Sequence, residues 1–285
     1  MKHINFTASG ILAGLANMLE LFGIDTEDHA IALGMNAPFL FLRKGGQYFA
    51  GSALYQPRWL DLYLKPIGFH MAEITYPKEE VAEFLRSQQT AMLPITLSSG
   101  NSHPVVFAGY IKGRYEFINI KPAHSAEPDN LSLSSAMLKR RLDDQVTINT
   151  LEHCPQQQMD FLPLFQDSLL NLDTYLNEVL QALNQTVNRE ELQALKTLLF
   201  RSLMQDMQPM ATLIGDFTLS EELRSLNHDY RHIFTQNSPP TVTLWEKLPR
   251  SSIRKCIAWL KEDINDQIHV YTELSKPPKA HARKK

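Results

Sequence analysis

Cysteine is scarce in this chain of 285 residues, and its absence from the first half is informative. The two cysteines, Cys154 and Cys256, are too few for a disulfide framework, and neither lies in a CxxC or metal-spaced cluster. We expect Cys256, inside a helical pattern, to be a small core residue, and Cys154 to lie in a linker. A reducing compartment, in the simplest case the cytoplasm, follows, with no metal site and no cofactor.

Long apolar runs and strong charge of one sign are also missing. No stretch reaches about 18 uninterrupted apolar residues, so we expect no membrane span. The N-terminal apolar run is broken by Asn17 and Glu20 and lacks a small-residue cleavage site, so we expect no signal peptide. The formal net charge is −3 and no basic stripe with interleaved aromatics occurs, so nothing indicates nucleic acid as a partner. The basic end, residues 276–285, is predicted to be a disordered tail.

What is present is a globular composition in two halves. Hydrophobic residues make up 44% and charged residues 21%, enough to bury a substantial core. Residues 1–150 mix helix and strand patterns, whereas residues 151–275 show apolar residues at helical spacing. We therefore predict an α+β domain over 1–150 and an all-helical domain over 151–275, with residues 151–158 as the linker.

Apolar spacing, caps and turn residues locate the elements. In the first half, helices are predicted over 12–22, 25–35, 57–65, 77–88 and 132–144, and strands over 38–44, 47–51, 70–76, 90–98, 103–111 and 114–121. The second of these helices is expected to be capped by Asp25 or Thr26. In the second half, helices are predicted over 161–185, 189–207, 220–234 and 252–274.

Three places in the first half have the residue types of a nucleophile site. A helix begins at the Ser9-Gly10 corner, where free backbone N–H groups and the positive end of the helix dipole favour an anion. His103 starts an apolar strand, and Asn119 lies on the next strand beyond a glycine turn. A papain-type site needs a nucleophile at a helix N-terminus, a histidine on a strand, and an Asn or Asp on the neighbouring strand. If His103 and Asn119 face each other across the hairpin, they come within hydrogen-bond reach.

Four ordered segments carry a family resemblance. They are "LANMLELFG", "IDTEDHAIALGMNAPFLFL", "LYLKPIGF" and "HPVVFAGYIKGRYEFIN". Together, from about Phe6 to Leu142, they resemble the papain-like superfamily in its peptidase C39-like branch, and specifically the N-terminal domain of the butirosin biosynthesis protein H family. The resemblance implies a papain-like first domain. It also implies acyl transfer, or amide or thioester hydrolysis, through a covalent acyl-enzyme. The implied partners are an acyl carrier protein and a small amine or peptide substrate.

The chain departs from this family at the nucleophile. The family has a cysteine at the start of its first helix, and counting back from Gly23 in the family's spacing reaches Gly10, with Ser9 one residue earlier. The third position, usually Asp, is Asn119, which can still orient a histidine. Carried over, Ser9 would attack and His103 would act as base and then as acid. Asn119 would orient His103, and helix N–H groups near Gly10 would bind the oxyanion.

Each of these residues also has a structural interpretation. Ser9 can be a helix N-cap, His103 a strand-end histidine with one satisfied hydrogen bond, and Asn119 a plain strand amide. Three hypotheses remain open: an acyltransferase or hydrolase of papain-like type, a catalytically inactive pseudoenzyme that serves as a binding module, or an interaction role for the helical half, with the loop around Trp245 as a docking element. A homo-oligomer is compatible with all three.

Two further motifs are weaker. His228 and His232 lie at i and i+4 with Asp229 nearby, a spacing that can hold a metal, but the glutamate of an HExxH zinc helix is missing. Residues 44–46, Lys-Gly-Gly, are too short for a phosphate loop and predict a turn between strands.

Overall fold

The computed structural model describes residues 1–5, 10–97, 100, 102–184, 200–235 and 249–274. The chain divides into two compact units, each built from two stretches of sequence. The sheet unit comprises Met1–Ala37 and Ser52–Met159, and the helical unit comprises Pro38–Gly51 and Asp160–Lys285. Residues 38–51 were predicted to belong to the domain over 1–150, but their contacts assign them to the helical unit.

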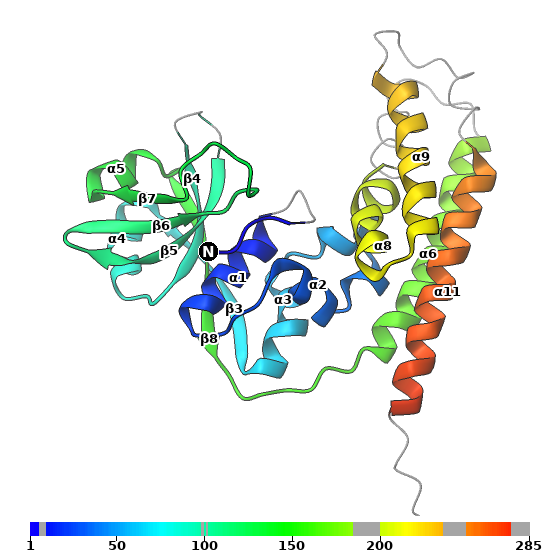
Figure 1. Cartoon of the computed structure of the whole chain (residues 1–285), viewed down its shortest axis with the longest axis horizontal. Coiled ribbons are helices and arrows are strands. Elements are labelled where there is room, and N and C mark those ends of the chain that lie inside the picture. Colours follow the sequence, from blue (N-terminus) through cyan, green and yellow to red (C-terminus); the bar gives the residue numbers. More distant parts are fainter. Residues whose placement is uncertain (6–9, 98–99, 101, 185–199, 236–248, 275–285) are drawn as a thin grey trace, which may run out of the picture. The chain divides into compact units, whose positions relative to one another are not determined.

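The sheet unit is of the α+β class, as predicted. Its six strands form one antiparallel sheet in the order β3-β8-β4-β5-β6-β7 (Figure 1). The strands are β3 (Phe69–Pro77), β4 (Ala91–Thr96), β5 (Ser102–Ile111), β6 (Arg114–Asn119), β7 (Asn130–Leu133) and β8 (Gln145–His153). The helices are α1 (Ile11–Leu21), α2 (Asp28–Gly34), α3 (Pro57–Leu64), α4 (Lys78–Arg86) and α5 (Ser135–Arg140).

Local sequence explains where these helices begin and end. Pro57 opens α3, where its missing N–H costs nothing, and the Ser134 hydroxyl accepts from the Met137 N–H at 3.3 Å to cap α5. Gly23, with φ at +82°, follows α1 and turns the chain. The cap predicted at Asp25 or Thr26 is wrong by one or two residues, because Glu27 is the N-cap of α2.

Two strands were not predicted. β7 and β8 are absent from the sequence analysis, and residues 151–153 of β8 were assigned to the linker. β8 pairs with β3 along its whole length, from Phe69 opposite His153 to Pro77 opposite Gln145. This ladder supplies the backbone hydrogen bonds that a free linker would lack, so the linker assignment is wrong for those three residues.

The two faces of the sheet carry different helices. One face is an apolar core in which strand residues such as Ile95, Val105 and Phe117 pack with Val81 and Leu85 of α4 and with Leu138 of α5. The alternate strand residues point to the other face, where α1 contacts β4 and β5. A Cβ added at Gly14 of α1 would lie 2.4 Å from the Met92 sulfur, so the helix presses directly on that face.

The helical unit consists of a hairpin and a set of helices. The hairpin is β1 (Phe41–Lys44) and β2 (Gln47–Ala50), joined at the Gly45-Gly46 turn as predicted. The other described elements are α6 (Leu162–Asn184), a π-helical segment η4 (Phe200–Met207), α8 (Gln208–Ile214), α9 (Phe217–Thr235) and α11 (Arg250–Leu274). Trp245, residues 276–285 and the first part of the predicted helix 189–207 lie outside the described residues.

Hydrogen bonds from its backbone to side chains tie the hairpin to helices that come much later in the chain. The Phe41 N–H donates to the buried Ser168 hydroxyl of α6 at 2.9 Å, and the Phe41 carbonyl accepts from the Asn171 amide at 3.0 Å. The Ser202 hydroxyl donates to the Tyr48 carbonyl at 2.9 Å. Gly51, with φ at +47°, ends the hairpin where a Cβ would lie 2.7 Å from the Asp206 carbonyl oxygen. The hairpin is therefore an integral part of the helical unit.

Candidate functional site

The first five residues of the chain are tied to α1, to α2 and to the chain that follows β6. The buried Asn17 side chain of α1 accepts from the Lys2 N–H at 2.8 Å and donates to the Lys2 carbonyl at 2.8 Å. The Asp28 carboxylate accepts from the Asn5 backbone and side-chain amides at 2.8 and 3.0 Å. Ile4 forms an isolated parallel bridge with Pro122, beyond the end of β6. These contacts place residues 1–5 beside the chain that follows the end of β6.

Gly10 is the N-cap of α1, with helical backbone angles and no side-chain cap. A Cβ added here would lie 2.9 Å from Cγ2 of Ile120 and 3.4 Å from Cγ of Pro104. A contact of 2.9 Å is too short for any real Cβ, so a side chain at this position requires Ile120 to move. Ser9 lies outside the described residues.

His103 lies on β5 directly opposite Ile95 of β4. Opposed residues of an antiparallel pair point to the same face, so His103 shares the face of Ile95 and Val105, which is covered by α4 and α5. The ring is partly buried, and its Nε2 atom is buried with no hydrogen-bond partner among the described residues.

Asn119 ends β6 opposite Val105 of β5 and is 1% exposed. It lies on the same face as His103, but two residues along from the position directly across the hairpin. Its amide group donates to the Pro128 carbonyl at 2.9 Å and to the Glu127 carboxylate at 3.4 Å. Its Oδ1 atom is buried and has no partner in the described part of the chain. His103 and Asn119 are thus diagonal neighbours that each leave one polar atom unpaired.

The three described positions are not gathered on one face. His103 and Asn119 lie on the face that α4 and α5 cover, whereas Gly10 packs against Pro104 and Ile120, whose side chains alternate to the other face. The two neighbouring strands were predicted from the sequence, but the face of the sheet against which α1 packs was not. His103 and Val105 are two residues apart in one strand and therefore point to the same face. This spacing could have shown that His103 faces the apolar core.

Lys121 belongs to the same region and was not singled out from the sequence. It is 5% exposed, donates to the Ser125 carbonyl at 3.1 Å and to the Glu127 carbonyl, and forms an ion pair with Asp129 at 2.7 Å. Hydrogen bonding to Lys121 lowers the pKa of the Asp129 carboxyl. Lys121 is two residues beyond Asn119, the spacing that places residues on one face of a strand, and Ile120 between them is buried as well. It clamps the loop after β6 onto the sheet.

The remaining sequence candidates have no catalytic arrangement. Burial raises the pKa of the Cys256 thiol to about 12, as expected for a core cysteine, while Cys154 is partly buried. His228 is exposed and lies 3.8 Å from the Asp229 carboxylate, and the side chain of His232 is not described. Among the residues that the structure describes, no group of three or more His, Cys, Asp or Glu side chains could hold a metal ion.

Comparisons with known proteins add no relationship to this geometry. No family model matches the chain, and no curated protein matches it. In the described ranges, no helix combines the length and the apolar character that crossing a membrane requires. The site must therefore be interpreted from its own residues.

Proposed function

We propose that this chain is a non-catalytic relative of papain-like, C39-like acyl-transfer enzymes, and that it acts as a binding module. The observation that carries the proposal is the arrangement around Gly10. The position that corresponds to the family's nucleophile has no side chain, and Ile120 and Pro104 fill the space in front of it.

The geometry gives a chemical reason. A nucleophile and its base must come within about 3 Å of each other, or be joined by one water. Gly10 and the His103–Asn119 pair belong to opposite faces of the sheet, so the sheet would lie between His103 and a side chain introduced at Gly10. A cysteine at this position would therefore clash with Ile120 and would not contact a general base.

The resemblance suggests which ligands such a module would recognise. The family that it resembles handles acyl groups delivered by a carrier protein and small amines or peptides, which present carbonyl acceptors or N–H donors. His103 Nε2 and Asn119 Oδ1 are unpaired among the described residues, and together they can offer one donor and one acceptor. Both atoms are buried, so a bound water can satisfy them in the free protein.

The proposal is tested by chemical labelling and by turnover. The full chain is incubated with a fluorophosphonate probe and, separately, with an acyl-pantetheine thioester. We expect no label on Ser9 and no thioester hydrolysis above that of buffer. Hydrolysis that disappears in Ser9→Ala but persists in Ser87→Ala, a matched change of an exposed serine, would overturn the proposal.

A second candidate is an active acyltransferase or hydrolase that uses Ser9. The observation in its favour is that His103 and Asn119 are diagonal neighbours on one face of the sheet, although no hydrogen bond joins the Asn119 Oδ1 atom to the imidazole among the described residues. In that case the fluorophosphonate would label Ser9, and His103→Ala would reduce the labelling rate at unchanged thermal stability. The same set of variants therefore decides between the two functions.

A further inference from the structure

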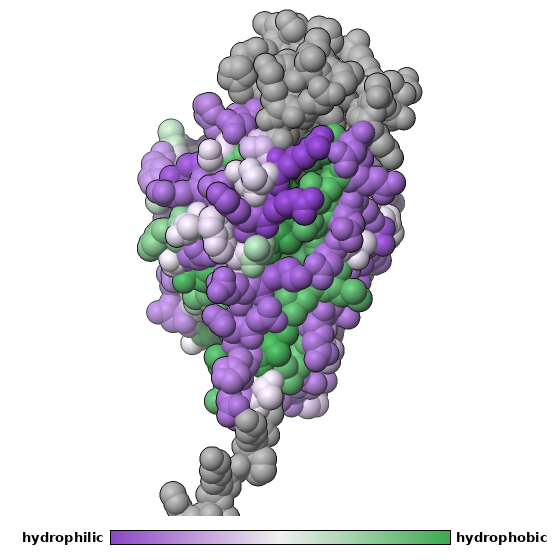
Figure 2. All heavy atoms as spheres, turned by 90° about the vertical axis from the view of Figure 1, so that its right-hand side faces the viewer, coloured by the Kyte–Doolittle hydropathy of each residue, from purple (hydrophilic) through white to green (hydrophobic). Residues whose placement is uncertain are grey.

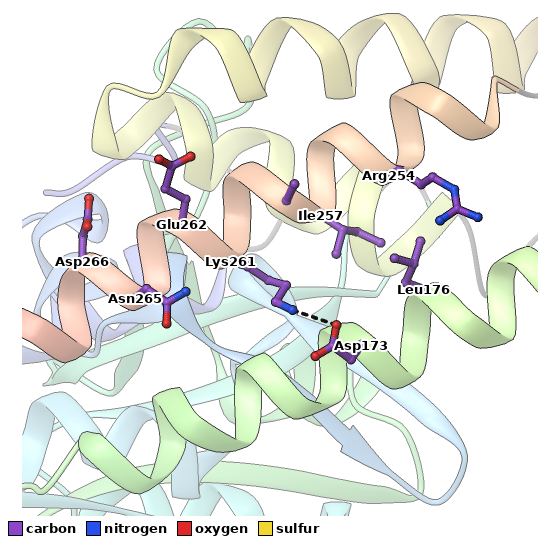
Figure 3. Close-up of a pocket in the computed structure, with 9 residues that line it drawn as sticks. Asp173, Leu176, Arg254, Ile257, Lys261, Glu262, Asn265 and Asp266 are labelled. Atoms are coloured by element: carbon purple, nitrogen blue, oxygen red, sulfur yellow. Dashed lines mark hydrogen bonds and ion pairs between the residues drawn. The ribbon is translucent and has the colours of Figure 1, made fainter.

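A groove on the helical unit lies between α6 and α11 and has charges of opposite sign along its length. Figure 3 shows the residues that line it, among them Asp173 and Leu176 of α6 and Arg254, Ile257, Lys261, Glu262 and Asp266 of α11. Lys261 and Asp173 pair across its middle at 2.8 Å. Arg254 lies toward one end, and Glu262 and Asp266 lie toward the other (Figure 3). No ion pair is seen for these three charges within the described part of the chain.

Apolar side chains also lie along this helix pair. The exposed Ala258 and the partly buried Leu176 contribute apolar surface near the middle of the groove, over the buried Ile257. Val270 and Leu274 follow Asp266 at intervals of four residues on α11, and they are 46% and 77% exposed. Figure 2 looks onto the side of Figure 1 where α6 and α11 are drawn, and an apolar strip is visible there between polar side chains. Exposed apolar surface framed by polar residues is typical of a protein contact.

The charge order along α11 restricts the partner. Residues 250–260 contain three basic and no acidic residues, whereas residues 262–274 contain four acidic residues and no Lys or Arg. An anionic membrane or a nucleic acid would be attracted to one end and repelled at the other. A complementary partner must be acidic where α11 is basic and basic where it is acidic. A second α11 running antiparallel has this order.

We propose that this groove is the self-association surface of the chain, and that it joins two copies through antiparallel α11 helices. With the two-fold axis at the level of Leu260, Arg254 of one copy lies opposite Asp266 of the other, and Ala258 lies opposite Glu262 of the other. The two charges on each helix are twelve residues, about 18 Å, apart. The small side chain of Ala258 lets the helices approach, and the symmetry forms each charge pair twice.

Charge reversal tests this arrangement on the full chain. Sedimentation equilibrium over a wide concentration range is expected to show a dimer. Arg254→Glu and Asp266→Arg should each weaken dimerisation by at least about tenfold, because each brings like charges together twice. An equimolar mixture of the two variants should form a heterodimer in native mass spectrometry, since both cross-pairs are then of opposite sign. The double variant R254E/D266R should form a homodimer again.

Matched controls identify other outcomes. Lys255→Glu makes the same charge change at an exposed position on α11 outside the groove and should leave the dimer intact. Circular dichroism melting checks that all variants fold. A monomeric wild-type chain at every concentration, or a dimer indifferent to both single reversals, would overturn the proposal. Failure of the mixture to pair would exclude the antiparallel register. None of these outcomes depends on whether the sheet unit is catalytic.

Discussion

In the sheet unit, buried polar side chains such as Asn17 and Asp28 bond to the backbone of the same unit. In the helical unit, charges on α11 such as Arg254 and Asp266 have no ion pair among the described residues. The first arrangement fixes a chain segment in place, because an unpaired buried group would cost free energy. The second leaves charge available at a surface. The sheet unit thus uses these polar groups to hold its own backbone, whereas the helical unit leaves these α11 charges to solvent.

The largest effect is expected in the sheet unit. Asn17→Leu removes a buried amide that bonds to the Lys2 backbone N–H and carbonyl and also to the Ala13 carbonyl. We expect a loss of about 2–3 kcal/mol in the free energy of unfolding, measured by urea denaturation. Ser87→Ala, which removes an exposed hydroxyl bonded to the Phe84 carbonyl, should cost less than about 0.5 kcal/mol. Equal losses in both variants would contradict a special role for Asn17.

An intermediate effect is expected where the helical unit does bury a polar contact. Ser168→Ala removes the acceptor for the Phe41 N–H of the hairpin. The expected loss is about 1–1.5 kcal/mol, because the buried N–H is left unpaired. Thr174→Ala is the control. The Thr174 hydroxyl donates to the Leu170 carbonyl four residues earlier, as Ser168 does to Leu164, but at an exposed site. A melting temperature that falls as much for Thr174→Ala as for Ser168→Ala would show that the hairpin contact adds nothing.

The smallest effect concerns Asp263 of α11. Burial and the neighbouring carboxylate of Asp216 raise the pKa of Asp263 from 3.8 to about 6, with smaller contributions from Asp266 and Glu262. Asp263 ionises at a lower pH in the unfolded chain than in the folded protein. The free energy of unfolding therefore falls as pH rises from about 4 to about 6. Asp263→Asn should remove this dependence and stabilise the protein by about 1 kcal/mol at pH 7 but not at pH 4, allowing for solvent screening. Denaturation at both pH values measures it. A variant less stable than wild type at pH 7 would contradict the sign.

Local sequence predicts much of the sheet unit, but not the long pairing of β8 with β3. β5 and β6 were predicted because apolar residues alternate on either side of the Gly113 turn, and a hairpin closes between neighbours in sequence. β8 was missed, although Val146 and Ile148 alternate with more exposed residues. Its partners β3 and β4 come before it along the chain, and no local pattern encodes such pairing.

The site was predicted in part for the same reason. Local patterns placed His103 and Asn119 on adjacent strands, and the structure has them on one face. Which face α1 covers depends on how the helix packs, and Gly10 reveals this only through its contacts with Ile120 and Pro104. The assignment of residues 38–51 to the helical unit likewise rests on contacts such as Phe41 with Ser168.

The position of the hairpin has a consequence for how the protein is made. Phe41 finds its hydrogen-bond acceptor 127 residues later in the sequence, so the hairpin leaves the ribosome long before α6 exists. Until then Phe41 and Tyr48, both buried in the finished protein, have each other but lack Tyr175 of α6, which contacts both rings. A nascent chain that stops near residue 159 would display them to solvent and to other chains. The interval between these two segments is therefore where a chaperone would be most useful to this protein.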